Sequence, residues 1–176
     1  MTVDIAVRPI TAEDVQGRIR DLVAILVDCV EGGASVSYLA PLSLDKAEAF
    51  WRNTAASVAD GSRAFLVAEE VGGRVLGTVQ VVLDQPENQP HRADISKLLV
   101  HRAARGQGLG ALLMTAAEEV ARAADKTLLV LDTATGSDAE RLYERSGWTR
   151  SGVIPDYALL PDGRPWSTTY FYKRLA

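Results

Sequence analysis

Leu98-Leu-Val-His-Arg-Ala-Ala-Arg-Gly-Gln-Gly-Leu-Gly-Ala-Leu-Leu113 joins a predicted strand to a predicted helix through a basic loop that contains three glycines. The strand is expected over residues 92–100, and the helix over residues 108–124, where apolar residues recur with helical spacing. Glycines leave backbone N–H groups unshielded, and the start of a helix carries a partial positive charge. This segment therefore predicts a site for an anionic group such as a phosphate.

Three interpretations of the glycine loop differ in their ligand. A turn without a ligand leaves unexplained the conformational entropy that three glycines cost at the entrance of a helix. Dinucleotide binding is suggested by Gly106, Gly108 and Ala111, which fit G-x-G-x-x-A, and by Asp132 at the end of the next predicted strand. Against it, residues 101–105 separate the strand from the first glycine, and too little chain follows for further βαβ units. The third interpretation is a coenzyme A pyrophosphate site.

The third interpretation rests on a resemblance to the GCN5-related N-acetyltransferase (GNAT) family. Arg105-x-x-Gly108-x-Gly110 is similar to the R/Q-x-x-G-x-G/A signature of that family. Ala139-Glu-Arg-Leu-Tyr143, followed by Gly147-Trp148, resembles its A-x-x-L-Y…G-F/W segment. One position departs from the pattern, because Gly136 stands where the family often has asparagine.

The other predicted elements fit one α/β domain over residues 1–176. Apolar runs predict further strands at residues 3–10, 64–70, 75–83, 127–132, near 153 and at 168–173. Helical spacing predicts further helices from residue 11 to about 32, from 43 to 61 and from 137 to 147. The resemblance implies a GNAT-like acyl-CoA N-acyltransferase fold, with a mixed and mostly antiparallel sheet of about seven strands flanked by four helices.

Composition limits the classes of function. The 176 residues are 47% hydrophobic and 24% charged, with a formal net charge of −4, which is typical of a globular domain. The acidic balance argues against nucleic acid as the main partner, and no apolar run is long enough to predict a membrane span. The single cysteine, Cys29, excludes an intramolecular disulfide and a cysteine-based zinc cluster. We expect a cytoplasmic protein that uses no metal.

For the co-substrate, the resemblance implies acetyl-CoA. Backbone amides of Leu98, Leu99 and Val100 would hold the pantetheine arm and the thioester carbonyl, where fixed donors stabilise developing charge. The pyrophosphate would bind at the glycine loop and the helix start, at Arg105, Gly106, Gln107, Gly108, Leu109, Gly110 and Ala111.

Three residues are candidates for catalysis. Asp94, before the loop, and Asp132, on the next strand, are candidates for the general base or for holding the ammonium group. An aspartate with its ordinary pKa near ~3.9 is a weak base, so either one requires a raised pKa or a water relay. Tyr143 matches the family's general acid, because a phenol with a pKa near ~10 stays protonated at neutral pH. The structural alternatives are solvated or turn-capping aspartates and a tyrosine of the core.

Loops outside the cofactor motif bear on the acceptor. Residues 32–42, 131–133 and 161–163 resemble those of the tabtoxin resistance branch of the family, which acetylates the amine of a β-lactam amino-acid toxin. The resemblance implies a small-molecule amine as acceptor, and a monomer or homodimer. Two alternatives stay open: acetylation of a protein or peptide, and a module that binds coenzyme A without turnover. A pocket closed by residues 34–42 and 157–166 would favour the small molecule, and an open acidic groove would favour the protein.

Overall fold

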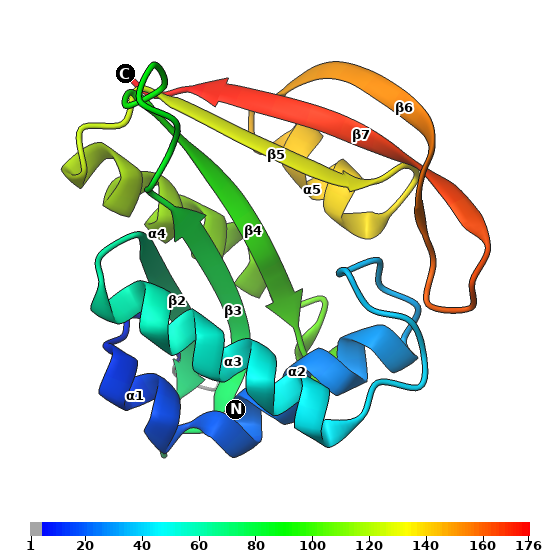
Figure 1. Ribbon diagram of the computed structural model, residues 1–176. Coiled ribbons are helices and arrows are strands. Elements are labelled where there is room, and N and C mark those ends of the chain that lie inside the picture. Colours follow the sequence, from blue (N-terminus) through cyan, green and yellow to red (C-terminus); the bar gives the residue numbers. More distant parts are fainter. Residues whose placement is uncertain (1–4) are drawn as a thin grey trace.

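The computed structural model describes residues 5–176, and its seven strands form a single sheet (Figure 1). In chain order, the elements are β1 (Ile5–Pro9), α1 (Ala12–Gly17), α2 (Ile19–Glu31), α3 (Leu44–Ala59), β2 (Arg63–Glu70), β3 (Val75–Val82), β4 (Arg92–Val100), the 3-10 turn η1 (Arg102–Ala104), α4 (Leu109–Ala123), β5 (Leu128–Ala134), α5 (Asp138–Arg145), β6 (Thr149–Leu159) and β7 (Pro165–Arg174).

The strands lie in the order β1-β2-β3-β4-β5-β7-β6. All neighbouring pairs are antiparallel except β4 and β5, which are parallel. Parallel neighbours need a crossover connection, and α4 provides it. The predicted mixed, mostly antiparallel α/β fold is therefore confirmed.

The parallel pair separates soon after it forms. Arg92–Asp94 pair with Leu128–Val130, and no later residue of β4 pairs with β5, although β4 continues to Val100. Figure 1 shows the two strands diverging, with β7 following β5. The edge of β4 that faces β5 over residues 95–100 therefore carries backbone N–H and C=O groups without a strand partner.

A β-bulge interrupts β4 at Lys97. Thr78 of β3 pairs with Leu99, whereas Gln80 pairs with Ser96, so β4 has an extra residue between these two pairs. Lys97 has a φ of 51°, and its carbonyl accepts a hydrogen bond of 3.0 Å from the Thr78 hydroxyl. Since side chains alternate along a strand, an extra residue exchanges the two faces beyond the bulge.

The two faces of the sheet are covered by different helices (Figure 1). One hydrophobic cluster joins the sheet to α4 and α5 and includes Leu113 and Tyr143. The other joins it to α1, α2 and α3 and includes Trp51. Ile95 belongs to the first cluster and Leu99 to the second, although this spacing would put both on one face of a regular strand. The bulge thus turns the end of β4 toward α2 and α3.

Residues 5–176 contain five α-helices rather than the four predicted. The helix expected from residue 11 is divided at Arg18, whose φ of −109° and ψ of 13° are not helical. The Arg18 guanidinium binds Asp14 of α1 at 3.0 Å and Glu69 of β2 at 2.7 Å, which anchors the break to the sheet. Hydrophobic spacing carries no signal for an ion pair between distant elements, so the sequence predicted a continuous helix.

Other boundaries agree well with the sequence. β4 spans Arg92–Val100 as predicted, and α5 begins after the expected Ser137 cap, whose hydroxyl accepts from the Glu140 amide. β6 and β7 are longer than predicted. The predicted first strand begins at residue 3, which lies outside the described residues, and its described part is β1.

Candidate functional site

The glycine loop presents free amides at the start of α4. Gly108, the N-cap, has a φ of 79°, and no side chain caps the helix. Leu112 is the first residue with an amide bonded to a helical acceptor, the Gly108 carbonyl at 3.2 Å. Leu109, Gly110 and Ala111 precede the first helical hydrogen bond, so their amides can bind an anion.

The three loop glycines have two different roles. Gly106 and Gly108 have φ values of 76° and 79°, in the left-handed region where an L side chain is strained. A Cβ on Gly110 would instead lie 2.9 Å from Cδ2 of Leu142 on α5. Gly110 therefore has a packing role besides presenting its amide, because its missing side chain allows α4 to pack against α5.

Both arginines of the loop bind other parts of the chain. The Nε of Arg105 donates to the Val100 carbonyl at 3.1 Å. The backbone N–H and Nε of Arg102 donate to the Asp28 carboxylate of α2 at 2.8 and 2.9 Å. These contacts help to fix the shape of the loop.

A cavity of about 340 Å³ lies on the α2–α3 side of the sheet, beyond the point where β4 and β5 separate. A backbone hydrogen bond of 2.9 Å from the Ala40 N–H to the Pro161 carbonyl links the two loops that border it. Three strands, β5, β6 and β7, and the loop that precedes α3 line the cavity. The lining residues are Ser35, Ser37, Tyr38, Leu39, Asp132, Thr133, Ala134, Tyr157, Ala158, Leu159 and Thr168.

Asp132 is the carboxylate in this lining. It lies on β5 opposite Tyr170 of β7, two residues beyond the last β4–β5 pair. Its Oδ2 accepts a hydrogen bond of 3.1 Å from the Thr168 hydroxyl, and the side chain is exposed. The capping of the turn after β5, considered as its structural alternative, is carried out by other groups, because Glu140 binds the Gly136 amide.

Asp94 lies at the apex of the opening, opposite Val130. Its carboxylate accepts hydrogen bonds from Arg92 at 2.5 Å and from the Gln85 amide at 3.1 Å. Asp94 is not one of the described residues that line the cavity. The two candidate carboxylates therefore differ, since Asp94 is paired within the protein and Asp132 faces the cavity.

Tyr143 lies on α5 and is only 5% exposed. Its ring packs against Trp148 and Phe171, with both centroid distances at 5.9 Å. Burial raises the pKa of the phenol above its usual range, and the negative charge of Asp132 raises this pKa further. Tyr143 is thus a core residue whose hydroxyl lies within electrostatic reach of the cavity carboxylate.

Sequence reasoning missed Tyr170. Its hydroxyl is 2.8 Å from that of Tyr157, which lines the cavity. This hydrogen bond, then burial and the charge of Asp132, raise the pKa of Tyr170 to about 12. The alternating Tyr170 and Tyr172 on the last strand were the available sequence signal. Trp166, at the end of the segment 157–166 that was expected to close the pocket, donates its indole N–H to the Thr135 carbonyl at 2.9 Å.

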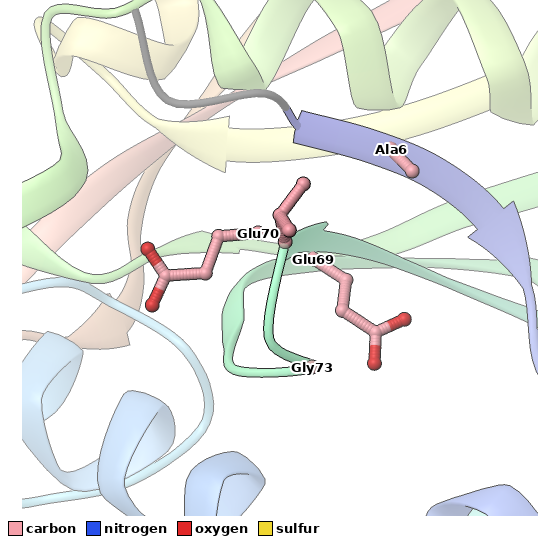
Figure 2. A pocket seen from close by; sticks show the side chains of 5 residues that line it. Ala6, Glu69, Glu70 and Gly73 are labelled. Atoms are coloured by element: carbon pink, nitrogen blue, oxygen red, sulfur yellow. The ribbon is translucent and has the colours of Figure 1, made fainter. Parts of the chain in front are cut away.

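A second hollow of about 370 Å³ lies beside the β2–β3 turn (Figure 2). Figure 2 shows the carboxylates of Glu69 and Glu70 pointing in different directions. Glu69 is bound by Arg8 and Arg18, at 3.1 and 2.7 Å. The hollow contains no candidate catalytic residue, and its lining consists of Ala6, Glu69, Glu70, Val71 and Gly73.

Two further features bear on the class of site. Within residues 5–176, no group of three or more metal-binding side chains is brought together. None of the helices in this range combines the length and the apolar character that crossing a membrane would require.

The model of the acetyltransferase (GNAT) family matches residues 33–148, which include the bulge, the glycine loop and Tyr143. The chain belongs to the GNAT family of acetyltransferases. The expectation of an N-acetyltransferase is thereby confirmed.

Solved structures share the GNAT fold over nearly the whole chain. A ribosomal-protein-alanine N-acetyltransferase from Brucella melitensis is 26% identical, with a TM-score of 0.76, covering 97% of this chain and 99% of that chain. A phosphinothricin acetyltransferase from Sinorhizobium meliloti, solved with acetyl-CoA, is 18% identical, with a TM-score of 0.80, covering 98% of this chain and 89% of that chain. An N-acetyltransferase from Staphylococcus aureus Mu50 is 19% identical, with a TM-score of 0.79, covering 98% of this chain and 99% of that chain.

Proposed function

We propose that this GNAT enzyme transfers the acetyl group of acetyl-CoA to the free amine of a small molecule. The observation that carries the proposal is the cavity with Asp132 in its wall, bordered by two loops that the Ala40–Pro161 hydrogen bond joins. Its volume of about 340 Å³ is at the lower end of the range for small-molecule sites. A protein acceptor would favour an open groove instead.

The co-substrate site is supported by backbone geometry. The amides at the start of α4, with the left-handed Gly108 before them, suit a pyrophosphate. The unpaired edge of β4 at residues 98–100 offers donors and acceptors to an extended pantetheine arm. The Sinorhizobium meliloti structure with acetyl-CoA supports the same assignment. When bound there, acetyl-CoA supplies an acetyl group activated as a thioester.

Asp132 is proposed to receive the amine. Its carboxylate holds an incoming ammonium group by charge and hydrogen bonding, and accepts its proton directly or through a water molecule. The Thr168 hydroxyl lies 3.1 Å from Oδ2 and 2.9 Å from the Thr133 carbonyl, so it borders one carboxylate oxygen and leaves the other for the acceptor. Asp94, bound to Arg92 and Gln85, is proposed to support the apex of the opening rather than to contact the amine.

Tyr143 is proposed to stabilise the leaving sulfur. Burial raises its pKa, so the phenol stays protonated throughout the neutral range. A thiol has a pKa near ~8.5, which makes complete transfer of the phenol proton to a thiolate unfavourable at equilibrium. The hydroxyl therefore acts as a hydrogen-bond donor to sulfur as negative charge develops there, in the manner of a fixed oxyanion donor.

The resemblance of residues 32–42 and 161–163 to the tabtoxin resistance branch supports an amino-acid-like acceptor. Phosphinothricin acetyltransferases among the solved structures are consistent with this class. The second candidate is acetylation of a protein N-terminus, which the name of the 26% identical Brucella melitensis enzyme favours.

The proposed function is tested by acetyl-CoA turnover, followed as release of free thiol. The acceptor panel contains amino acids, polyamines, aminoglycosides and peptides. We expect turnover with at least one small amine, well above hydrolysis of acetyl-CoA alone. Normal acetyl-CoA binding without turnover on any acceptor would identify the non-catalytic module instead.

Gly108→Val should weaken acetyl-CoA binding by more than tenfold. A valine with φ near 79° is strained by roughly 1–2 kcal/mol, and its side chain crowds the anion that the loop amides would bind. Calorimetric titration with acetyl-CoA measures the effect. Gly61→Val at the end of α3 is a matched control, because Gly61 has a φ of 78°, has no neighbour within 4 Å and lies outside the loop. Unchanged affinity in a folded Gly108→Val variant would contradict the assignment of the loop.

A further inference from the structure

The bulge in β4 directs one lysine toward the acceptor cavity. The Lys97 ammonium donates a hydrogen bond of 3.0 Å to the Ser37 hydroxyl, and Ser37 belongs to the cavity lining. The same ammonium lies 5.7 Å from the centre of the Phe50 ring of α3. In a regular strand, residue 97 would share a face with Ile95, which packs against α4. The bulge therefore places this cation on the substrate side.

A second cation lies behind the first. Arg63, at the start of β2, binds the side-chain oxygen of Gln80 through Nη1. Its Nε is buried and has no hydrogen-bond partner. The Gln80 amide nitrogen is 3.5 Å from the Thr54 hydroxyl of α3, so this polar group lies between the sheet and α3. The positive charge of Arg63 reaches Lys97, whose pKa it lowers.

Neither cation is paired with an acid. No carboxylate in the described range 5–176 lies within salt-bridge distance of Lys97 or Arg63, and burial lowers the pKa of both groups. Two partly buried cations within electrostatic reach of each other are unfavourable, because each loses hydration and repels the other. This arrangement occurs in a chain with a net charge of −4, where acidic partners are plentiful elsewhere. An anion brought by the ligand would remove the penalty.

The cavity therefore has two electrostatic poles. Burial and the charge of Arg63 lower the pKa of Lys97, whereas the negative charge of Asp132 raises it. Asp132 thus places a carboxylate in one wall, and the Lys97 ammonium, backed by a guanidinium, is hydrogen-bonded to Ser37 of another wall. An acceptor with an amino group and a carboxylate complements both poles.

We propose that Lys97, supported by Arg63, binds a carboxylate of the acceptor while Asp132 binds its amino group, so that the substrate is an amino acid or a close analogue. The inference rests on the proposed function and names the substrate class of the same site. A charge-assisted hydrogen bond from Lys97 would supply selectivity of about 10- to 100-fold over a neutral analogue.

The competing explanation is that Lys97 only anchors the loop at Ser37. Both roles predict some loss of activity when Lys97 is replaced, but they differ in selectivity. Loss of a loop anchor weakens every acceptor alike. Loss of a carboxylate contact weakens only acceptors that carry the carboxylate.

The test compares kcat/KM for α-amino acids with kcat/KM for the matching α-carboxamides, using wild type and Lys97→Met. Rates are referred to the concentration of unprotonated amine, since carboxamides have less basic amino groups. We expect wild type to favour the carboxylates by about 10- to 100-fold, and Lys97→Met to reduce this preference to within about threefold. Lys97→Arg should retain most of it, because it keeps the positive charge.

Lys46→Met is the matched control. Lys46 is exposed on α3, and its replacement removes the same positive charge. It should keep the wild-type preference. Calorimetric titration of CoA-loaded protein with the same acceptor pairs gives a second readout, independent of turnover. Equal use of carboxylates and carboxamides by wild type, or an unchanged preference in Lys97→Met, overturns the inference while leaving acetyl transfer intact. Failure to acetylate any amine in the panel contradicts the proposed function itself.

Discussion

Tyr143→Phe should lower the single-turnover rate of acetyl transfer by about 10²- to 10⁴-fold, the range for removing a proton or hydrogen-bond donor from a transition state. The substitution removes one oxygen from the phenol. The ring keeps its contacts with Trp148 and Phe171. The measurement uses rapid quench with saturating acetyl-CoA, because slow product release would hide part of the effect in kcat.

Stability and affinity provide the controls for this variant. The melting temperature and the Kd for acetyl-CoA should both stay close to wild type, since the aromatic packing is retained. A variant that binds both substrates and transfers acetyl at the wild-type rate would reduce Tyr143 to a residue of the α5 core. The raised pKa adds a second expectation: no basic limb of the pH–rate profile below pH ~10 should arise from ionisation of Tyr143.

Asp132→Asn should lower kcat/KM for the amine by about 10²- to 10⁴-fold while leaving acetyl-CoA affinity nearly unchanged. Asparagine keeps the shape and can still accept from the Thr168 hydroxyl, but it neither attracts an ammonium group nor takes up its proton. The acid limb of the pH profile should also flatten, because the proton acceptor is removed.

Asp94→Asn is the informative companion to Asp132→Asn. Its carboxylate is bound to Arg92 and Gln85 and lies outside the cavity lining, so we expect a much smaller kinetic effect. The reverse order of effects would assign the amine to the apex of the opening. Full activity and an unchanged profile in both variants would contradict any carboxylate base at this site.

Much of the fold was accessible from local sequence signals. The glycine loop between a strand and an apolar helix, the Ser137 cap and the spacing to Tyr143 are short-range patterns, and each predicted its element correctly. Their order along the chain indicated one α/β domain, and the resemblance of two motifs to the GNAT family implied the GNAT fold. The break at Arg18 was missed because it depends on Glu69, which is distant in sequence and carries no periodic signal.

The candidate site was less accessible for the same reason. Lys97 was not selected, because its position depends on a bulge that arises from the register between β3 and β4. The link between the two loops that border the cavity depends on the hydrogen bond from Ala40 to Pro161, which no local pattern encodes. The different surroundings of Asp94 and Asp132 likewise follow from where the two strands separate. Sequence reasoning named both acids but could not distinguish them.

The central claim is that a cavity lined by Asp132 accepts a small free amine. It is tested most directly by comparing the best amino-acid acceptor of the panel with a heptapeptide that begins with the same residue. With saturating acetyl-CoA, the account predicts a kcat/KM at least about tenfold higher for the free amino acid, because its carboxylate is retained and the joined loops restrict a longer chain. An equal or higher kcat/KM for the peptide, or no transfer to the free amino acid, would contradict it.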